Sequence, residues 1–287
     1  MTNLYTINCG HFKLDGGAMF GVVPKSIWNE LNPADANNMC NWATRSLLIE
    51  ADGRLILVDC GMGDKQSEKF FGYYYLNGND NLDKSLAAYG FHREDITDVF
   101  LTHLHFDHCG GAIKREGERL VPAFKHARYW SNEAHWDWAI HPNPREKASF
   151  LKENILPIQE SGMLHFITGR TDQAADLATA PFFSGFDIRF ANGHTDAMML
   201  PQLQYKGKTI VFMADLLPSP GHIPLPYVMA YDTRPLITMT EKEAFLREAL
   251  EKEYILFFEH DPYIECCTLK ETPRGIRADQ FFKLSDL

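Results

Sequence analysis

Residues 102 to 111, THLHFDHCGG, place three histidines and an aspartate within six positions. In an extended chain, residues two apart point to the same side, so His103, His105 and Asp107 would point together. His108 breaks this alternation, and we expect the chain to turn into a helix there, helped by the two glycines that follow. Neutral imidazoles and carboxylates are ligands for zinc and similar divalent ions. The stretch therefore predicts a metal site, with His103 and His105 aimed at one point and Asp107 and His108 at a neighbouring one.

A polar loop with chance histidines is the alternative, and it would be favoured for a lone histidine. A cluster without a metal gains little for the cost of removing its polar groups from water. A metal site needs further ligands, and three candidates directly end apolar runs: His194 after FDIRFA, Asp215 in KTIVFMAD and His260 in YILFFEH. Each alone is more typical of a cap or turn residue. Together with the histidine-rich stretch they predict a metal centre.

The elements that must position these residues are short apolar runs separated by turn signals. RSLLIEA (45–51) and RLILVD (54–59) flank Asp52-Gly53, which predicts a β-hairpin. Further strands are expected at 95–103, 186–191, 198–205, 208–215 and 254–260, and helices at 82–90, within 132–156 and at 240–253. Thr240 and Glu243 would cap the last helix. This order predicts a layered α/β fold of two sheets covered by helices. Because no linker or repeat interrupts it, we expect one domain over residues 1–287.

Composition narrows the range of partners. Lys and Arg number 28 against 38 Asp and Glu, for a net charge of −10, and such acidity disfavours a nucleic-acid partner. No run approaches the roughly 18 apolar residues of a membrane span, and the first residues do not have the pattern of a signal peptide. The six cysteines form no CxxC pair, as in cytoplasmic proteins with reduced thiols. We expect a cytoplasmic protein that binds a small-molecule substrate and neither nucleic acid nor membrane, with a homodimer left open.

With these residues in this order, the chain resembles the metallo-β-lactamase superfamily from RSLLIEADGRLILVDCG to FFEHD. The resemblance implies an αββα sandwich of two mixed sheets flanked by helices, with a metal site along one edge of the sheets. Asp59 matches a family aspartate that supports the ligand loop, although an ordinary turn aspartate is the alternative. The metal ligands that the resemblance implies are His103, His105 and His194 for one ion, Asp107, His108 and His260 for a second, and Asp215 as a bridge between both.

The resemblance implies a hydrolase in which a hydroxide held by two divalent ions cleaves a carboxylic ester or lactone. Zinc is the first expectation for these ions, and iron, manganese, cobalt or nickel also fit such ligands. Asp107 would in addition orient the hydroxide or protonate the leaving group. Phosphotriester or thioester hydrolysis at the same site is one alternative, and a non-catalytic metal-binding or signalling protein of the same fold is another. The complete ligand set favours the enzyme.

The ligand set resembles the glyoxalase II, lactonase and tRNA-processing branches, and the acidity of the chain weakens the last. True β-lactamases with a cysteine ligand carry it where this chain has Asp215, which counts against that activity. Quorum-quenching lactonases carry a tyrosine three residues after the bridging aspartate, and Pro218 stands there in this chain. His222, Tyr227 or Tyr231 could supply the missing hydrogen bond to the substrate, with ordinary loop packing as the alternative for each.

Overall fold

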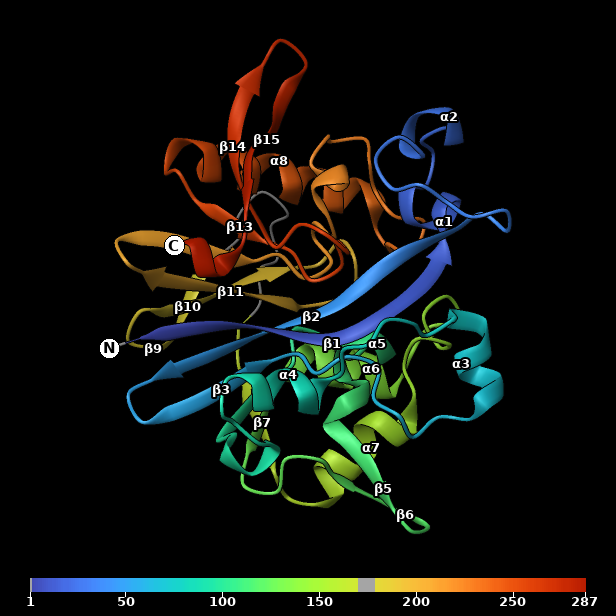
Figure 1. Ribbon diagram of the computed structural model, residues 1–287, viewed down its shortest axis with the longest axis vertical. Helices are drawn as coiled ribbons and strands as arrows, with labels where there is room; N and C mark the ends of the chain where they lie inside the picture. Colours follow the sequence, from blue (N-terminus) through green and yellow to red (C-terminus); the bar gives the residue numbers. More distant parts are fainter. Residues whose placement is uncertain (1, 170–178) are drawn as a thin grey trace. The chain divides into compact units, whose positions relative to one another are not determined.

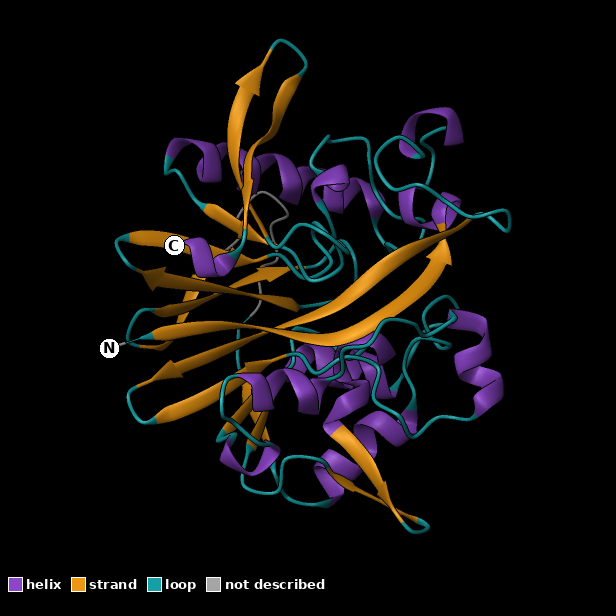
Figure 2. Cartoon of the chain, in the orientation of Figure 1, coloured by secondary structure: helices purple, strands orange, loops and turns teal. Residues whose placement is uncertain are grey.

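The computed structural model describes residues 2–169 and 179–287, and the chain divides into two compact units (Figure 1). Unit 1 comprises residues 1–12 and 43–169, and unit 2 comprises residues 13–42 and 170–287. Each unit contains a mixed β-sheet together with helices (Figure 2). The mixed α/β class expected from the sequence is therefore confirmed.

The sheet of unit 1 has the strand order β1-β2-β3-β4-β7-β8, although residues 13–15 of β1 and 39–42 of β2 belong to unit 2. Its strands are β1 (Asn3–Asp15), β2 (Met39–Ala51), β3 (Arg54–Val58), β4 (Asp98–Phe100), β7 (Arg128–Asn132) and β8 (Leu164–Ile167). Strands β2 and β3 are antiparallel, whereas β3, β4, β7 and β8 run parallel to one another. The predicted hairpin is confirmed, with Asp52 and Gly53 at φ of 50° and 72°, the left-handed conformation that a tight turn needs.

Five helices and a small hairpin complete unit 1. They are α3 (Glu68–Tyr74), α4 (Leu82–Ala88), α5 (Phe106–Cys109), α6 (Glu133–Ile140) and α7 (Lys152–Glu160), with strands β5 (Ile113–Glu116) and β6 (Arg119–Pro122). The core buries Leu57, Val99 and Tyr129 of the strands with Trp136 of α6 and Ile155 of α7. Burial of these large apolar side chains is the main force that holds the helices to the sheet.

The sheet of unit 2 has the strand order β15-β14-β13-β12-β11-β10-β9. Its strands are β9 (Thr179–Phe183), β10 (Phe186–Ala191), β11 (Met198–Tyr205), β12 (Lys208–Phe212), β13 (Ile255–Phe257), β14 (Cys266–Thr272) and β15 (Gly275–Phe282). Only β12 and β13 pair in parallel among these strands. The helices are α1 (Gly16–Phe20), α2 (Lys25–Trp28) and α8 (Pro235–Glu251), and α8 contacts β14 and β15.

Three sequence predictions differ from the structure. The last helix begins at Pro235 rather than near Thr240, because proline has the φ angle of a first helical position and no N–H to lose there. Thr240 lies inside the helix, where its hydroxyl donates to the carbonyl of Leu236. The strand expected at 95–103 is confined to β4, since the 3-10 helix Arg93–Asp95 precedes it and the chain leaves the sheet after Leu101, whose backbone N–H still donates to Trp130. The helical stretch expected within 132–156 is two helices, α6 and α7.

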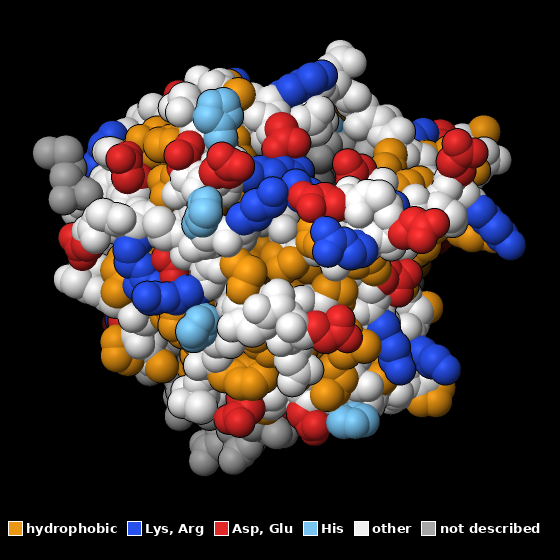
Figure 3. All heavy atoms as spheres, turned by 90° about the horizontal axis from the view of Figure 1, so that it is seen from below, with side chains coloured by type: hydrophobic (Ala, Val, Ile, Leu, Met, Phe, Trp, Pro, Cys, Tyr) orange, Lys and Arg blue, Asp and Glu red, His pale blue; other side chains and the backbone are white. Residues whose placement is uncertain are grey.

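The surface mixes charges of both signs. Acidic and basic side chains lie interspersed over the face drawn in Figure 3. Among the residues that the structure describes, no helix combines the length and the apolar character needed to cross a membrane.

Candidate metal centre

The histidine-rich loop of unit 1 is fastened at the end of a parallel strand pair. Val58 of β3 and Phe100 of β4 are in register, so both strands end at the same edge of the sheet. Asp59 follows β3 there, fully buried, and its carboxylate accepts hydrogen bonds from the backbone N–H of Thr102 (2.8 Å) and from the Thr102 hydroxyl (2.6 Å). The position of Asp59 therefore sets where the chain leaves β4.

The first two histidines of this loop present nitrogens at metal-ligand spacing. His103 Nε2 and His105 Nδ1 are 3.1 Å apart. Two nitrogens bound to one tetrahedral zinc at its usual bond length are about 3.3 Å apart. The remaining nitrogens have polar neighbours, with His103 Nδ1 3.1 Å from the Thr102 hydroxyl and His105 Nε2 3.4 Å from Glu146 Oε1. Such outer contacts fix the orientation of ligating imidazoles, so both rings fit metal binding.

The other two predicted ligands of this loop lie on the short helix α5. His108 Nδ1 is 3.1 Å from Asp59 Oδ2, and His108 Nε2 is 3.8 Å from Asp107 Oδ2. His108 is fully buried, whereas Asp107 keeps a small exposed fraction. Asp59 therefore contacts both the loop and one of its histidines, which suits the supporting role that the resemblance implies.

The two glycines after α5 let it approach the turn that follows β3. A Cβ on Gly110 would lie 2.2 Å from the carbonyl oxygen of Met62, and one on Gly111 would lie 2.1 Å from that of Cys60. Cys60 in turn donates its backbone N–H to the carbonyl of His108 at 2.8 Å. Any side chain at either glycine would separate α5 from this turn.

Leu104, between the candidate ligands His103 and His105, is held by a residue that the sequence does not point to. Its backbone N–H donates to His135 Nε2 at 2.9 Å, and its carbonyl accepts from the Cys109 thiol at 3.3 Å. Burial raises the pKa of Cys109 to about 12, so this thiol packs rather than reacts. His135 lies on α6, about thirty residues along the chain, and no local pattern marks it.

The aromatic side chains of α3 pack against Phe106, at the start of α5. The rings of Phe70 and Tyr74 lie 5.3 and 4.7 Å from that of Phe106, the residue before Asp107. Burial, and then the charge of Asp107, raises the pKa of Tyr74 to about 12. Tyr74 therefore stays neutral and can donate a hydrogen bond.

In unit 2 the three predicted ligands follow strands that end at one edge. Strands β12 and β13 are parallel, with Phe212 opposite Phe257, and Asp215 and His260 each come three residues later. Strand β10 runs in the same direction as β12, because both are antiparallel to β11 between them. His194 follows β10, so the sheet itself gathers these side chains.

Asp215 contacts both histidines with separate oxygens. Its Oδ2 is 3.1 Å from His194 Nε2, and its Oδ1 is 3.0 Å from His260 Nε2. A carboxylate with each oxygen directed at a different imidazole is suited to bridge two cations. On the far side of the His194 ring, Nδ1 is 2.8 Å from Asp232 Oδ1. Asp232 was not predicted, because a lone aspartate in a loop carries no signal.

The charges around His194 favour a cation. Burial lowers the pKa of His194, but the carboxylates of Asp215 and Asp232 outweigh burial and raise that pKa to about 10. The same two carboxylates would attract a divalent ion, which could take the place of the proton on Nε2. The donor set of unit 2 thus fits a metal.

The loop after Asp215 contains the candidate substrate residues. The carbonyl of Pro218 accepts the backbone N–H of His260 at 3.2 Å. His222 is buried, with Nδ1 2.9 Å from the Ser219 hydroxyl and Nε2 2.9 Å from the carbonyl of Met19, so both nitrogens have protein partners. Tyr227 is half-buried, and Tyr231 is 39 % exposed. The two tyrosines are therefore more accessible to a ligand than His222.

Each unit thus brings its own predicted ligands together. His103, His105, Asp107 and His108 are neighbours in unit 1, and His194, Asp215 and His260 are neighbours in unit 2. Their assignment to two particular ions stays a prediction, as does a role in substrate binding for His222, Tyr227 or Tyr231.

Comparisons with known proteins place this geometry in a family. The family model of the metallo-β-lactamase superfamily matches residues 41–260. A structure described as a probable metal-dependent hydrolase from Staphylococcus aureus is 27% identical, with a TM-score of 0.86 over 98% of this chain and 96% of that one. The structure of AidC, a dizinc quorum-quenching lactonase, is similar with a TM-score of 0.78 over 98% of this chain and 96% of that one; at 22% identity this likeness shows the fold alone.

Curated relatives match a shorter part. An N-acyl homoserine lactonase of Bacillus thuringiensis is 26% identical over 164 residues, which is 54% of this chain and 56% of the relative. The chain therefore spans little more than half the length of the curated relatives it matches. The family model covers both units, from β2 to His260. The chain belongs to the metallo-β-lactamase superfamily.

Proposed function

We propose that this protein is a metal-dependent hydrolase that cleaves a carboxylic ester or a lactone. The observation that carries the proposal is Asp215, whose two carboxylate oxygens lie 3.1 and 3.0 Å from the imidazoles of His194 and His260. The similarity to lactonases supports an ester or lactone substrate, because several curated relatives bear that name. As in those lactonases, the substrate would be a small molecule.

The proposed cofactor is a pair of divalent ions. Zinc is the expected metal, and iron, manganese, cobalt and nickel are the alternatives. The ligands would be His103, His105 and His194 for one ion, Asp107, His108 and His260 for the other, and Asp215 for both. Two divalent ions supply a hydroxide at neutral pH and stabilise negative charge on oxygen during hydrolysis. The 3.1 Å spacing of His103 and His105 nitrogens supports this assignment.

The protein's own residues would orient the substrate and move a proton. Asp107 is the proposed proton carrier: its carboxylate would take the proton of the hydroxyl group added to the carbonyl carbon and pass it to the departing alkoxide oxygen, so that a carboxylate and an alcohol are released. Its small exposed fraction allows contact with substrate. Tyr227 and Tyr231 would donate hydrogen bonds to the substrate oxygen in place of the tyrosine that Pro218 replaces. His222 is the weakest of the three candidates, since its ring nitrogens already have partners.

Three further expectations go with this function. We propose that residues 1–287 form a single domain, because the family model spans residues of both units. We propose a cytoplasmic enzyme without nucleic-acid or membrane partners. The oligomeric state in solution would show whether it forms a homodimer. We also propose that β-lactamase activity is absent, since Asp215 stands in place of the cysteine ligand.

The test is a hydrolysis panel on zinc-loaded protein. It covers aryl esters, lactones including acyl-homoserine lactones, thioesters, phosphotriesters and a chromogenic cephalosporin, with the His103→Ala protein as background. We expect the highest kcat/KM on an aryl ester or lactone, and modest rates on acyl-homoserine lactones because of Pro218. A cephalosporin hydrolysed faster than every ester and lactone would overturn the proposal. No turnover at all with two bound metals would favour a binding protein instead.

A further inference from the structure

The buried face of α8 contains two adjacent ionisable side chains, one acidic and one basic. Residues Thr238, Glu241, Lys242, Phe245 and Ala249 form this face, with the spacing of an amphipathic helix. Glu241 and Lys242 are 0% and 1% exposed. Burial of a charged side chain is costly unless hydrogen bonds compensate for the lost water. The hydrogen bonds of these two side chains therefore explain why ionisable residues occupy positions on α8 where apolar residues are expected.

Glu241 holds the segment that leads into His194. Its carboxylate accepts the backbone N–H groups of Asn192 (2.6 Å) and Gly193 (3.0 Å). This segment lies directly on α8, since a Cβ on Gly193 would be 2.4 Å from the backbone nitrogen of Thr238. Two hydrogen bonds to consecutive N–H groups fix both the position and the direction of the backbone just before His194.

Lys242 holds a different loop. Its ammonium group donates to the carbonyl oxygens of Pro224 (3.1 Å), Leu225 (3.4 Å) and Tyr227 (2.8 Å). An ammonium has three donors, and all three are used here. The segment Pro224–Tyr227 carries one of the proposed substrate-binding tyrosines, so Lys242 sets the path of the backbone from which that side chain projects.

Packing alone does not explain why Glu241 and Lys242 are ionisable residues. Well-packed apolar residues in place of buried ionisable side chains often leave a protein as stable or more so. An apolar pair at these two positions would fill the same space, yet it would leave the backbone groups of both loops without these hydrogen bonds. Glu241 and Lys242 thus act on loop geometry rather than on the helix.

We propose that Glu241 and Lys242 are positioning residues with separate tasks in one active site. Glu241 positions His194 for metal binding, and Lys242 positions the Pro224–Tyr227 segment for substrate binding. The assignment rests on the proposed hydrolase function. It requires that the two residues affect different measurable quantities: zinc affinity for the first, and KM for the second.

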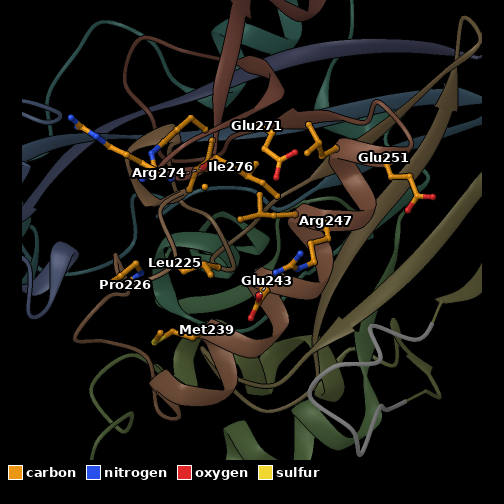
Figure 4. A pocket seen from close by; sticks show the side chains of 14 residues that line it. Leu225, Pro226, Met239, Glu243, Arg247, Glu251, Glu271, Arg274 and Ile276 are labelled. Atoms are coloured by element: carbon orange, nitrogen blue, oxygen red, sulfur yellow. Dashed lines mark hydrogen bonds and ion pairs between the residues drawn. The ribbon is translucent and has the colours of Figure 1, made fainter.

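The first experiment compares Glu241→Gln with a matched substitution on the opposite side of α8. Glu243 lines a groove of about 760 Å³ with Met239, Arg247 and Glu251 (Figure 4), so Glu243→Gln is the control. Zinc alone is titrated into metal-free full-length protein in competition with a chelator. We expect Glu241→Gln to bind zinc about 10- to 100-fold more weakly, with faster hydrogen exchange at the Gly193 amide, and Glu243→Gln to bind like the unaltered protein. Unchanged zinc affinity together with unchanged exchange would overturn the role of Glu241.

Arg234 provides a second route if Glu241→Gln does not fold. Its guanidinium donates to the carbonyl of Asn192 at 2.7 Å and to Asp196 at 2.9 Å, so it holds the same segment from a less buried site. Arg234→Met should weaken zinc binding in the same direction. Zinc affinity equal to that of the unaltered protein would count against positioning of this segment.

The second experiment uses Lys242→Met, with the exposed Lys252→Met as its control. On the best substrate of the panel, we expect Lys242→Met to raise KM about tenfold while kcat and zinc affinity change little. Lys252→Met should leave all three unchanged. Hydrogen exchange at the Tyr227 amide, which donates to the carbonyl of Pro224, should rise in Lys242→Met alone.

These readouts separate the inference from the proposed function. If the unaltered protein hydrolyses nothing, the function fails, while zinc affinity and hydrogen exchange still test the two positioning roles. If Lys242→Met lowers zinc affinity as strongly as Glu241→Gln does, or leaves KM and exchange at Tyr227 unchanged, the separate tasks are wrong.

Discussion

The imidazole of His194 and the carboxylate of Asp232 lie 2.8 Å apart, on the side of the ring opposite to Asp215. A hydrogen bond at Nδ1 places the proton there, so Nε2 is the ring nitrogen that can bind a cation. Asp232 is almost completely buried, so water competes little for its hydrogen bond with His194. The pair therefore sets both the tautomer and the orientation of a proposed ligand.

Substitution of Asp232 by asparagine should weaken zinc binding. The amide keeps the size of the carboxylate but lacks its charge, and loss of such outer contacts costs about 10- to 100-fold in metal affinity. Chelator competition on metal-free protein measures the effect. Asp279→Asn, at an exposed ion pair with Lys270, is the control and should bind zinc normally. Equal zinc affinity in the two variants would show that Asp232 does not orient the ligand.

Asp215→Ala should cost more activity than Asp59→Ala. Asp215 contacts two histidines directly through separate oxygens, whereas Asp59 contacts His108 and the backbone of Thr102 from outside the site. We expect Asp59→Ala to lose about 10- to 100-fold and Asp215→Ala to approach the His103→Ala background. The measurement is kcat/KM at full zinc loading, verified by elemental analysis. A larger loss in Asp59→Ala would mean that Asp215 is not the bridge.

The grouping of the candidate ligand residues was predictable because their positions follow from strand ends. His194, Asp215 and His260 each follow an apolar run, and parallel or alternate strands of one sheet end at one edge, so neighbours in space could be inferred without coordinates. The hairpin at Asp52-Gly53 was predictable for a similar reason, since its turn chemistry is local.

The supporting residues were not predictable, because their contacts are long-range. Their number includes Asp232, Glu146 and His135, which contact His194, His105 and the backbone of Leu104 from elsewhere in the sequence, and nothing near them in the chain indicates these contacts. The burial of Glu241 and Lys242 on α8 was not predictable for a different reason. Glu241 and Lys242 look like surface residues of an amphipathic helix, but backbone groups of two loops hold both of them inside. The β14–β15 hairpin also went unpredicted, since its strands are only partly buried and mix polar with apolar residues without regular alternation.

Zinc content and stability should change together. We predict two zinc ions per chain by elemental analysis after reconstitution, because seven nitrogen and oxygen ligands are available and a bridging carboxylate serves two ions. Removal of the metal should lower the Tm, since ions that bind only the folded state stabilise it. Asp215→Ala should show a smaller loss of Tm on chelation. A stoichiometry near zero after reconstitution would refute the metal centre.

His222 should make the protein acid-sensitive in a defined pH window. Burial lowers the pKa of His222 to about 3, although the hydrogen bond with the carbonyl of Met19 acts in the opposite direction. In the unfolded chain the pKa of a histidine is about 6.5. Between these values the unfolded chain binds a proton that the folded protein does not, so the free energy of unfolding falls as the pH falls below about 6.5.

The expected size of this effect at pH 5 is roughly 2 kcal/mol relative to pH 7.5. His222→Gln provides the comparison, because glutamine also has a donor and an acceptor but does not titrate. Urea unfolding of metal-free protein at both pH values isolates the contribution, since every other titrating group is common to the two proteins. The stability advantage of the unaltered protein over His222→Gln should shrink by this amount on acidification. Curves that stay parallel from pH 7.5 to pH 5 would mean that His222 takes up a proton in the folded protein as readily as in the unfolded chain, and its stacking on Phe20 at 4.5 Å would then involve an imidazolium at pH 5.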